Sequence, residues 1–177
     1  MDKGEKLQLL RDAIKTYPDF PKPGIVYRDI FGVFRDIVAL RAMRDLIVEH
    51  ILFLEVDVVV GLDSRGFLFG PLICMELGKP FVPVRKKGKL PGKVLGHKIT
   101  LEYGEDTLEI QTEYVSKGSR VLIVDDLLAT GGSMTGAINL VKSVGAEVTE
   151  CLAIIELTGL KGREKLGVPV HSFIQYD

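Results

Sequence analysis

The stretch "VLIVDDLLATGGS" (residues 121–133) decides the fold of this chain. The apolar run predicts a buried strand over 120–126 with the two aspartates at its tip, and the small residues after Leu128 predict a turn that opens a helix over 133–145. Apolar positions of that helix share one face, Ser133 can cap its start and Gly145 can end it. Strand, turn and helix in this order are typical of a parallel α/β sheet.

The rest of the chain continues this alternation. An amphipathic helix is expected over 5–16, and the charged, glycine-containing stretch 86–119 predicts a loop with a hairpin. Further strands, covered on both faces, are predicted where the chain is almost continuously apolar: 56–62, 80–85, 146–157 and 170–176. We therefore expect an α/β fold with a mostly parallel, doubly wound sheet flanked by helices, whose ligands bind at the carboxyl ends of the strands.

Composition restricts the class of protein. A chain of 177 residues that is 46% hydrophobic suits one compact domain, and 23 basic against 24 acidic residues create no global field for nucleic acid or a membrane surface. The start of the chain lacks a secretory pattern, so we expect a cytoplasmic protein without nucleic-acid or membrane partners. Cys74 and Cys151 each lie in an apolar stretch and are interpreted as core thiols.

The turn formed by Ala129, Thr130, Gly131, Gly132 and Ser133 predicts an anion site. Free amides at the start of a helix and the positive end of the helix dipole point at one spot. The two glycines let backbone approach a phosphate closely, while the hydroxyl groups add donors. The turn has no Walker lysine, so a phosphate monoester is favoured over a nucleoside triphosphate.

The adjacent acids Asp125 and Asp126 precede this turn. Ionised carboxylates accept hydrogen bonds from vicinal hydroxyls, so phosphate and diol together describe a ribose 5-phosphate. Two alternatives remain open at this point: a solvated strand end, or acids that hold a metal ion.

Two further stretches are suited to anions. "GLDSRGFLFG" (61–70) also leads from a strand into a helix and adds the fixed charge of Arg65, although ordinary helix capping by Ser64 would explain it too. "RKKGKLPGKVLGHK" (85–98) has six basic residues and no acid. It is interpreted either as a solvated loop or as a contact for a polyphosphate.

The acid pair followed by T-G-G-S resembles the signature of type I phosphoribosyltransferases. With "GLDSRGFLFG", three more stretches extend the resemblance over essentially the whole chain and point to the members that act on adenine: "DFPKPGIVYRDI" (19–30), "LEYGEDTLEIQ" (101–111) and "ELTGLKGREKL" (156–166). The resemblance implies a type I phosphoribosyltransferase fold in one domain, 1–177, with a small N-terminal hood at about 1–35 and a flexible catalytic loop at about 86–110.

The resemblance also implies an activity. A member would transfer ribose 5-phosphate from phosphoribosyl pyrophosphate to adenine, giving AMP and pyrophosphate, with Mg²⁺ chelated by the substrate and no direct metal ligands from the protein. It would act as a homodimer. Two alternatives stay open: a relative that uses hypoxanthine, guanine or xanthine, and a regulator that binds phosphoribosyl pyrophosphate without catalysis.

Roles for individual residues follow from the same resemblance. Glu102 and Tyr103 would close over the substrates, with the glutamate near the purine as a proton donor or relay. Backbone groups of Val26 and Arg28 would contact adenine, and Leu157 would form an apolar wall. Pyrophosphate would be bound at a turn with a cis peptide between Asp63 and Ser64. The residues assigned to pyrophosphate are Asp63, Ser64, Arg65, Arg85 and Lys89. Of these, Lys89 would reach the neighbouring subunit's site.

Overall fold

The computed structural model describes residues 1–101 and 104–177, and its described part divides into two compact units, Met1–Phe53 and Leu54–Asp177. The expectation that residues 1–177 act as one domain, with a hood at about 1–35, stays a prediction. None of the helices in the described ranges is both long enough and apolar enough to cross a membrane.

The first unit is mostly helical. It contains α1 (Lys3–Ala13), α2 (Phe31–Arg35) and α3 (Ile37–Ile51), together with a two-stranded antiparallel sheet of β1 (Lys15–Tyr17) and β2 (Tyr27–Asp29). The predicted helix over 5–16 begins two residues earlier, because Asp2 and Glu5 form a capping box at its start. It ends at Ala13, and the chain then enters β1.

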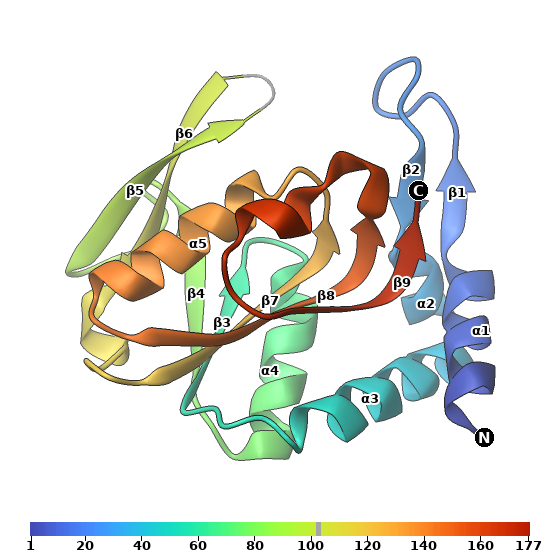
Figure 1. The fold of residues 1–177 in the computed structure, drawn as a ribbon, viewed down its shortest axis with the longest axis horizontal. Coiled ribbons are helices and arrows are strands. Elements are labelled where there is room, and N and C mark those ends of the chain that lie inside the picture. The colour runs from blue at the N-terminus through green and yellow to red at the C-terminus, as the bar shows by residue number, and fades with distance from the viewer. Residues whose placement is uncertain (102–103) are drawn as a thin grey trace. The chain divides into compact units, whose positions relative to one another are not determined.

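The second unit is built on one seven-stranded sheet, in the order β5-β6-β4-β3-β7-β8-β9 (Figure 1). Strands β4, β3, β7, β8 and β9 run parallel, whereas β6 and β5 are antiparallel additions at one edge. The predicted mostly parallel sheet is thereby confirmed. The strands are β3 (Val58–Leu62), β4 (Phe81–Lys86), β5 (Val94–Leu101), β6 (Gly104–Gln111), β7 (Arg120–Leu128), β8 (Glu147–Leu157) and β9 (Val170–Tyr176).

Helices cover both faces of the central strands. Inward-facing residues of α5 (Gly132–Ser143), such as Leu140, share one buried cluster with Val60 of β3 and Ile123 of β7. Helix α4 (Gly66–Leu77) contacts β3 and β7 from the other face, as Figure 1 shows. All five residues of β3 are buried, which explains why its sequence is continuously apolar rather than alternating.

Three short 3-10 helices complete the second unit: η1 (Thr112–Tyr114), η2 (Thr158–Leu160) and η3 (Gly162–Lys165). The hairpin predicted within 86–119 is present as β5 and β6, and β6 extends the main sheet by pairing with β4. Cys74 and Cys151 are free and buried, as expected for core thiols.

Two local predictions at the end of β7 are wrong. The strand continues past Asp126 to Leu128, because Leu127 and Leu128 still pair with β8. The two aspartates therefore belong to the strand rather than to its tip. Ser133 does not cap α5: the N-cap position is Gly131, in a left-handed conformation, and it has no side-chain hydrogen bond.

Candidate active site

The aspartate pair lies in the last third of β7. Asp126 is buried and Asp125 is half-buried, and the Asp126 amide donates to Asp125 Oδ1 at 2.8 Å. Arg65 Nε donates to Asp126 Oδ2 at 2.5 Å. Desolvation raises the pKa of the Asp125 carboxyl well above its ordinary value, and the negative charge of Asp126 acts in the same direction. A positive charge placed beside Asp125 would favour its ionised form.

The segment Ala129–Ser133, here called the phosphate loop, follows directly. Gly131 has φ 86°, which favours glycine, and its carbonyl accepts from the Thr135 amide at 2.9 Å as α5 begins. A cavity of ≈ 200 Å³ is lined by Arg65 and residues 125–134. The predicted phosphate and ribose residues are thus gathered around one hollow.

The turn after β3, residues 63–65, forms the second predicted anion site. Its Asp63-Ser64 peptide is cis, as the resemblance implied. Glycine is required at the start of α4, because a Cβ on Gly66 would lie 2.7 Å from the Val124 carbonyl oxygen of β7. The helix start is therefore held tightly against the strand that carries the aspartates.

Arg85 connects this turn to β4. Its Nε donates to Asp63 Oδ2 at 2.7 Å, and its Nη1 lies 3.4 Å from the Lys89 carbonyl oxygen. A cavity of ≈ 280 Å³ is lined by the residues predicted for pyrophosphate, except Arg65, and by others: Leu62, Asp63, Ser64, Val84, Arg85, Lys86, Lys89, Ile99, Leu101, Leu108, Asp125 and Ser133. Asp125 lines both cavities, so the two predicted anion sites adjoin at that residue.

Sequence reasoning missed Glu109, a buried acid in β6. Its Oε1 accepts from the Gly88 amide at 2.6 Å and so holds the turn that carries Lys89. The turn itself bends at Gly88, which has φ 87°. The position of Glu109 between the apolar residues Leu108 and Ile110 is a sequence signal that could have found it, and the structure places it opposite Arg85.

The residues predicted for the base are in different parts of the chain. Leu157 ends β8 and is half-buried, in the second unit. Val26 is exposed and Arg28 lies in β2, both in the first unit, where Arg28 Nη1 donates to Thr16 Oγ1 at 2.7 Å. Glu102 and Tyr103 lie outside the described residues.

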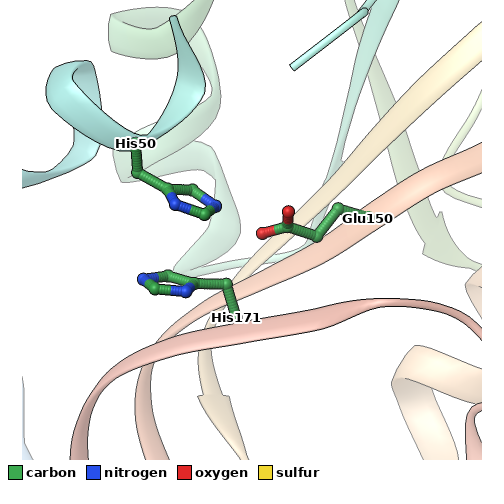
Figure 2. Close-up of side chains that lie close together, drawn as sticks. All are labelled: His50, Glu150 and His171. Carbon is green, nitrogen blue, oxygen red and sulfur yellow. The ribbon is translucent and has the colours of Figure 1, made fainter. Parts of the chain in front are cut away.

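Glu150 and His171 form a separate pair on β8 and β9, with donor atoms within 4.8 Å of each other (Figure 2). The His171 ring also contacts the Phe173 ring edge-on, with centroids 4.8 Å apart.

A parallel sheet with two anion-binding turns and an acid pair at its carboxyl edge is the architecture of phosphoribosyltransferases, and residues 37–174 match the family model described as "Phosphoribosyl transferase domain". An adenine phosphoribosyltransferase of Drosophila pseudoobscura pseudoobscura is 52% identical over 174 residues, which cover 97% of this chain and 96% of that protein. The chain belongs to the adenine phosphoribosyltransferase family.

Solved structures agree with this assignment. The crystal structure of adenine phosphoribosyltransferase from Rhodothermus marinus has a TM-score of 0.91 at 45% identity, covering 98% of this chain and 99% of that one. The Saccharomyces cerevisiae enzyme, complexed with adenine and an imino-altritol bisphosphate, has a TM-score of 0.90 at 42% identity, covering 96% of this chain and 99% of that one.

Proposed function

We propose that this chain forms AMP and pyrophosphate from adenine and phosphoribosyl pyrophosphate, using the acid pair and the two turns at the carboxyl edge of its sheet. The observation that carries this assignment is the hollow shared by Asp125, Asp126 and the phosphate loop. It combines acceptors for a diol with amides for a phosphate, and these are the two ends of a ribose 5-phosphate.

The phosphate loop anchors the 5-phosphate. Backbone amides from the start of α5 and the hydroxyls of Thr130 and Ser133 supply donors without any cationic side chain in the loop. The ribose hydroxyls then face Asp125 and Asp126, which accept their hydrogen bonds. This arrangement holds the reacting carbon of the ribose at a fixed distance from the second turn.

The acid pair also favours the transition state. Loss of pyrophosphate leaves positive charge on the ribose ring, as in glycoside cleavage. Asp125 lies in a desolvated position next to a second carboxylate, an arrangement that disfavours its negative charge until a cation arrives beside it. A cationic ribose is therefore bound more tightly than the neutral ground state, which is the requirement for catalysis.

Pyrophosphate leaves toward the turn after β3. Ser64, Arg85 and Lys89 line the cavity there. Arg65, the last residue of the turn, forms an ion pair with Asp126. These cations neutralise charge that develops on the leaving group. Asp63 contributes by orienting the Arg85 guanidinium through their 2.7 Å hydrogen bond.

Mg²⁺ would arrive chelated by the substrate. The carboxylates of Asp63 and Asp126 offer oxygen ligands of the type Mg²⁺ prefers, but each is already engaged by an arginine. Asp125 and Ser133 line the pyrophosphate cavity and could meet the hydration shell of the ion. When bound, the ion would neutralise phosphate charge during departure.

Adenine recognition is assigned to Val26, Arg28 and Leu157. The half-buried Leu157 offers an apolar surface at the end of β8 for the flat face of the base. The resemblance assigns backbone contacts with the base edge to Val26 and Arg28, and closure over the substrates to Glu102 and Tyr103. Closure would exclude water from the cationic intermediate.

The active form is proposed to be a cytoplasmic homodimer in which Lys89 reaches the neighbouring site. Large apolar side chains of α4 support a partner surface: Met75 is 86% exposed and Leu68 is 36% exposed. The two reduced, buried cysteines suit a reducing compartment.

The test offers adenine, hypoxanthine, guanine and xanthine together, with phosphoribosyl pyrophosphate and Mg²⁺, and separates the products by chromatography. AMP as the dominant product is expected. Another nucleotide would keep the phosphate and ribose roles and overturn the base assignment. Binding of phosphoribosyl pyrophosphate without any nucleotide product would instead favour a non-catalytic sensor.

A further inference from the structure

The segment from Gly162 to Lys165, here called the brace, packs against the phosphate loop from a distant part of the second unit. It contains the helix η3 and follows β8 after the η2 turn. It is absent from the cavity formed by Arg65 and residues 125–134, in which the 5-phosphate and ribose are proposed to bind. Its residues therefore touch the loop from outside that cavity, and Lys165 lines a separate hollow with Thr130, Gly131 and Gly132.

The closest approach is between two backbones. A Cβ on Gly162 would lie 2.3 Å from the Ala129 carbonyl oxygen and 3.1 Å from the Gly131 amide nitrogen. A Cβ on Gly131 would in turn lie 2.9 Å from the Gly162 carbonyl oxygen. Both residues must be glycine for the loop and the brace to keep this distance, because a methyl group at either position has no room.

A second contact comes from the end of the brace. Lys165 Nζ donates to the Thr130 carbonyl oxygen at 3.2 Å. This contact holds the carbonyl of the peptide bond between Thr130 and Gly131. The amide of the same peptide bond points in the opposite direction. Since α5 has no side-chain cap of its own, the loop conformation depends on neighbours of this kind.

The brace is itself anchored in the sheet. Arg163 makes a bidentate ion pair with Glu156, with Nε and Nη2 at 3.0 and 2.6 Å from the carboxylate oxygens, and Arg163 Nη1 donates to the Val170 carbonyl at 2.6 Å. Ser172 donates to the same carboxylate at 2.5 Å. Glu156 is buried at the end of β8, directly beside Leu128 at the end of β7. Leu166, immediately after the brace, is part of the buried core.

These contacts lead from the end of β8 and the beginning of β9 to the turn that follows β7. We infer that Gly162 and Lys165, held by the Glu156–Arg163 ion pair, are positioning residues that set the conformation in which the phosphate loop binds the 5-phosphate. This inference rests on the proposed function of that loop. It assigns to "GREK" (162–165) a role in phosphate affinity, without contact between the brace and the substrate.

The decisive comparison uses two glycines of the same connection. Gly162→Ala introduces a methyl group against the Ala129 carbonyl, whereas Gly159→Ala meets only the backbone carbonyl carbon of Asp177 at an ordinary 3.4 Å. For each variant we would measure the Kd of ribose 5-phosphate by calorimetry, KM for each substrate, kcat, and Tm.

We expect Gly162→Ala to weaken ribose 5-phosphate binding and raise KM for phosphoribosyl pyrophosphate by about tenfold to a hundredfold, as small misplacements of binding groups do. KM for adenine should change by less than about twofold, because a positioning role acts on one substrate only. Gly159→Ala should match the wild type. Unchanged ribose 5-phosphate affinity in a folded Gly162→Ala protein, or equal losses in both variants, would overturn the inference.

A second pair keeps the inference testable if Gly162→Ala fails to fold. Lys165→Met removes the contact with Thr130, while Lys161→Met removes an equal charge from the same connection. We expect a loss of ribose 5-phosphate affinity of about threefold to tenfold for Lys165→Met alone, in line with one solvent-exposed hydrogen bond that acts on the ligand only through the loop, and partial rescue by Lys165→Arg. Equal losses for the two methionine variants would indicate only a general charge effect and contradict the inference.

Measurements on the wild type distinguish failure of this inference from failure of the proposed function. If the wild type binds ribose 5-phosphate but forms no AMP, the transferase assignment fails while the brace can still be tested by binding. If the wild type forms AMP and Gly162→Ala retains full ribose 5-phosphate affinity, the function stands and the brace does not.

Discussion

The two strand-to-helix turns of the second unit, both proposed to bind anions, differ in the groups that they offer. The turn after β3 is surrounded by charged side chains that already pair with one another, Arg65 with Asp126 and Arg85 with Asp63. The phosphate loop after β7 contains no charged residue and relies on backbone amides and hydroxyls. The first suits a leaving group whose charge changes during reaction, and the second suits a phosphate that must stay in place.

The largest effect is expected where both turns meet, at the acid pair. Asp125→Asn and Asp126→Asn keep the shape of the side chain but remove its negative charge and replace one acceptor oxygen by an amide donor, so kcat should fall by roughly 10²–10³-fold for each, the usual cost of one preorganised electrostatic group. Steady-state kinetics and circular dichroism would check this. Asp57→Asn, in the same unit just before β3, is the matched control and should leave kcat nearly unchanged. Full turnover in either acid-pair variant would remove the acid pair from the mechanism.

Substitutions in the two turns should have smaller effects on KM for phosphoribosyl pyrophosphate, and these effects should differ between the turns. Arg85→Gln removes a charged donor and should raise KM for phosphoribosyl pyrophosphate by about tenfold or more, whereas Ser133→Ala removes one neutral donor and should raise it by about threefold to tenfold. The two variants should also differ in salt dependence, since salt screens charges far more than neutral hydrogen bonds.

Kinetics between low and high potassium chloride would measure that difference. Arg85→Gln should flatten the increase of KM with salt, and Ser133→Ala should leave its slope unchanged. Identical slopes would mean that the two turns do not differ in the way described.

A stability effect of pH is expected away from both turns. The Asp57 carboxylate accepts three hydrogen bonds from the Arg120 side chain and amide, and these bonds lower the pKa of Asp57 to about 2. Its ordinary pKa in an unfolded chain is about 3.9, so the ionised form stabilises the fold above that pH and the stabilisation is lost as pH falls toward 2.

Asp57→Asn should therefore lower Tm at pH 7 and have a progressively smaller effect below about pH 4. Thermal unfolding of both proteins from pH 7 to pH 3 would measure it. A Tm difference that stays constant across this range would argue against an ionised, hydrogen-bonded Asp57.

The smallest effect is expected for the thiols. Burial raises the pKa of Cys74 to about 11 and that of Cys151 to about 12, so little thiolate is present at neutral pH. The native protein should resist iodoacetamide at pH 7 without loss of activity, as measured by mass spectrometry and assay. Rapid alkylation of the native state with loss of activity would show that a thiol is accessible and important.

Much of the second unit follows from local sequence. Strands β3 and β8 are apolar runs because both of their faces are covered, and the order of strand, glycine-containing turn and helix predicts where ligands bind. Boundaries were harder: β7 continues through Leu127 and Leu128 because β8 offers pairing partners there, which no local pattern of β7 reveals.

The supporting contacts of the site could not be predicted in the same way. Glu156 and Arg163 are close in sequence and form an ion pair. The Glu156 carboxylate also accepts a hydrogen bond from Ser172 on β9, a later strand. Glu109 supports Gly88 across a strand pairing. The available signal was the position of Glu109 between the apolar residues Leu108 and Ile110, which indicates a buried partner without identifying it.

The ion pair between Arg65 and Asp126 connects the two turns, so that ligand binding at one turn can affect ligand affinity at the other. An anion that draws Arg65 toward the leaving-group side also changes the charge that Asp126 presents to the ribose side. By linkage, any preference this creates must be reciprocal: if pyrophosphate alters the affinity for ribose 5-phosphate by some factor, ribose 5-phosphate alters the affinity for pyrophosphate by the same factor. A single guanidinium can thereby couple the affinities of the two product sites.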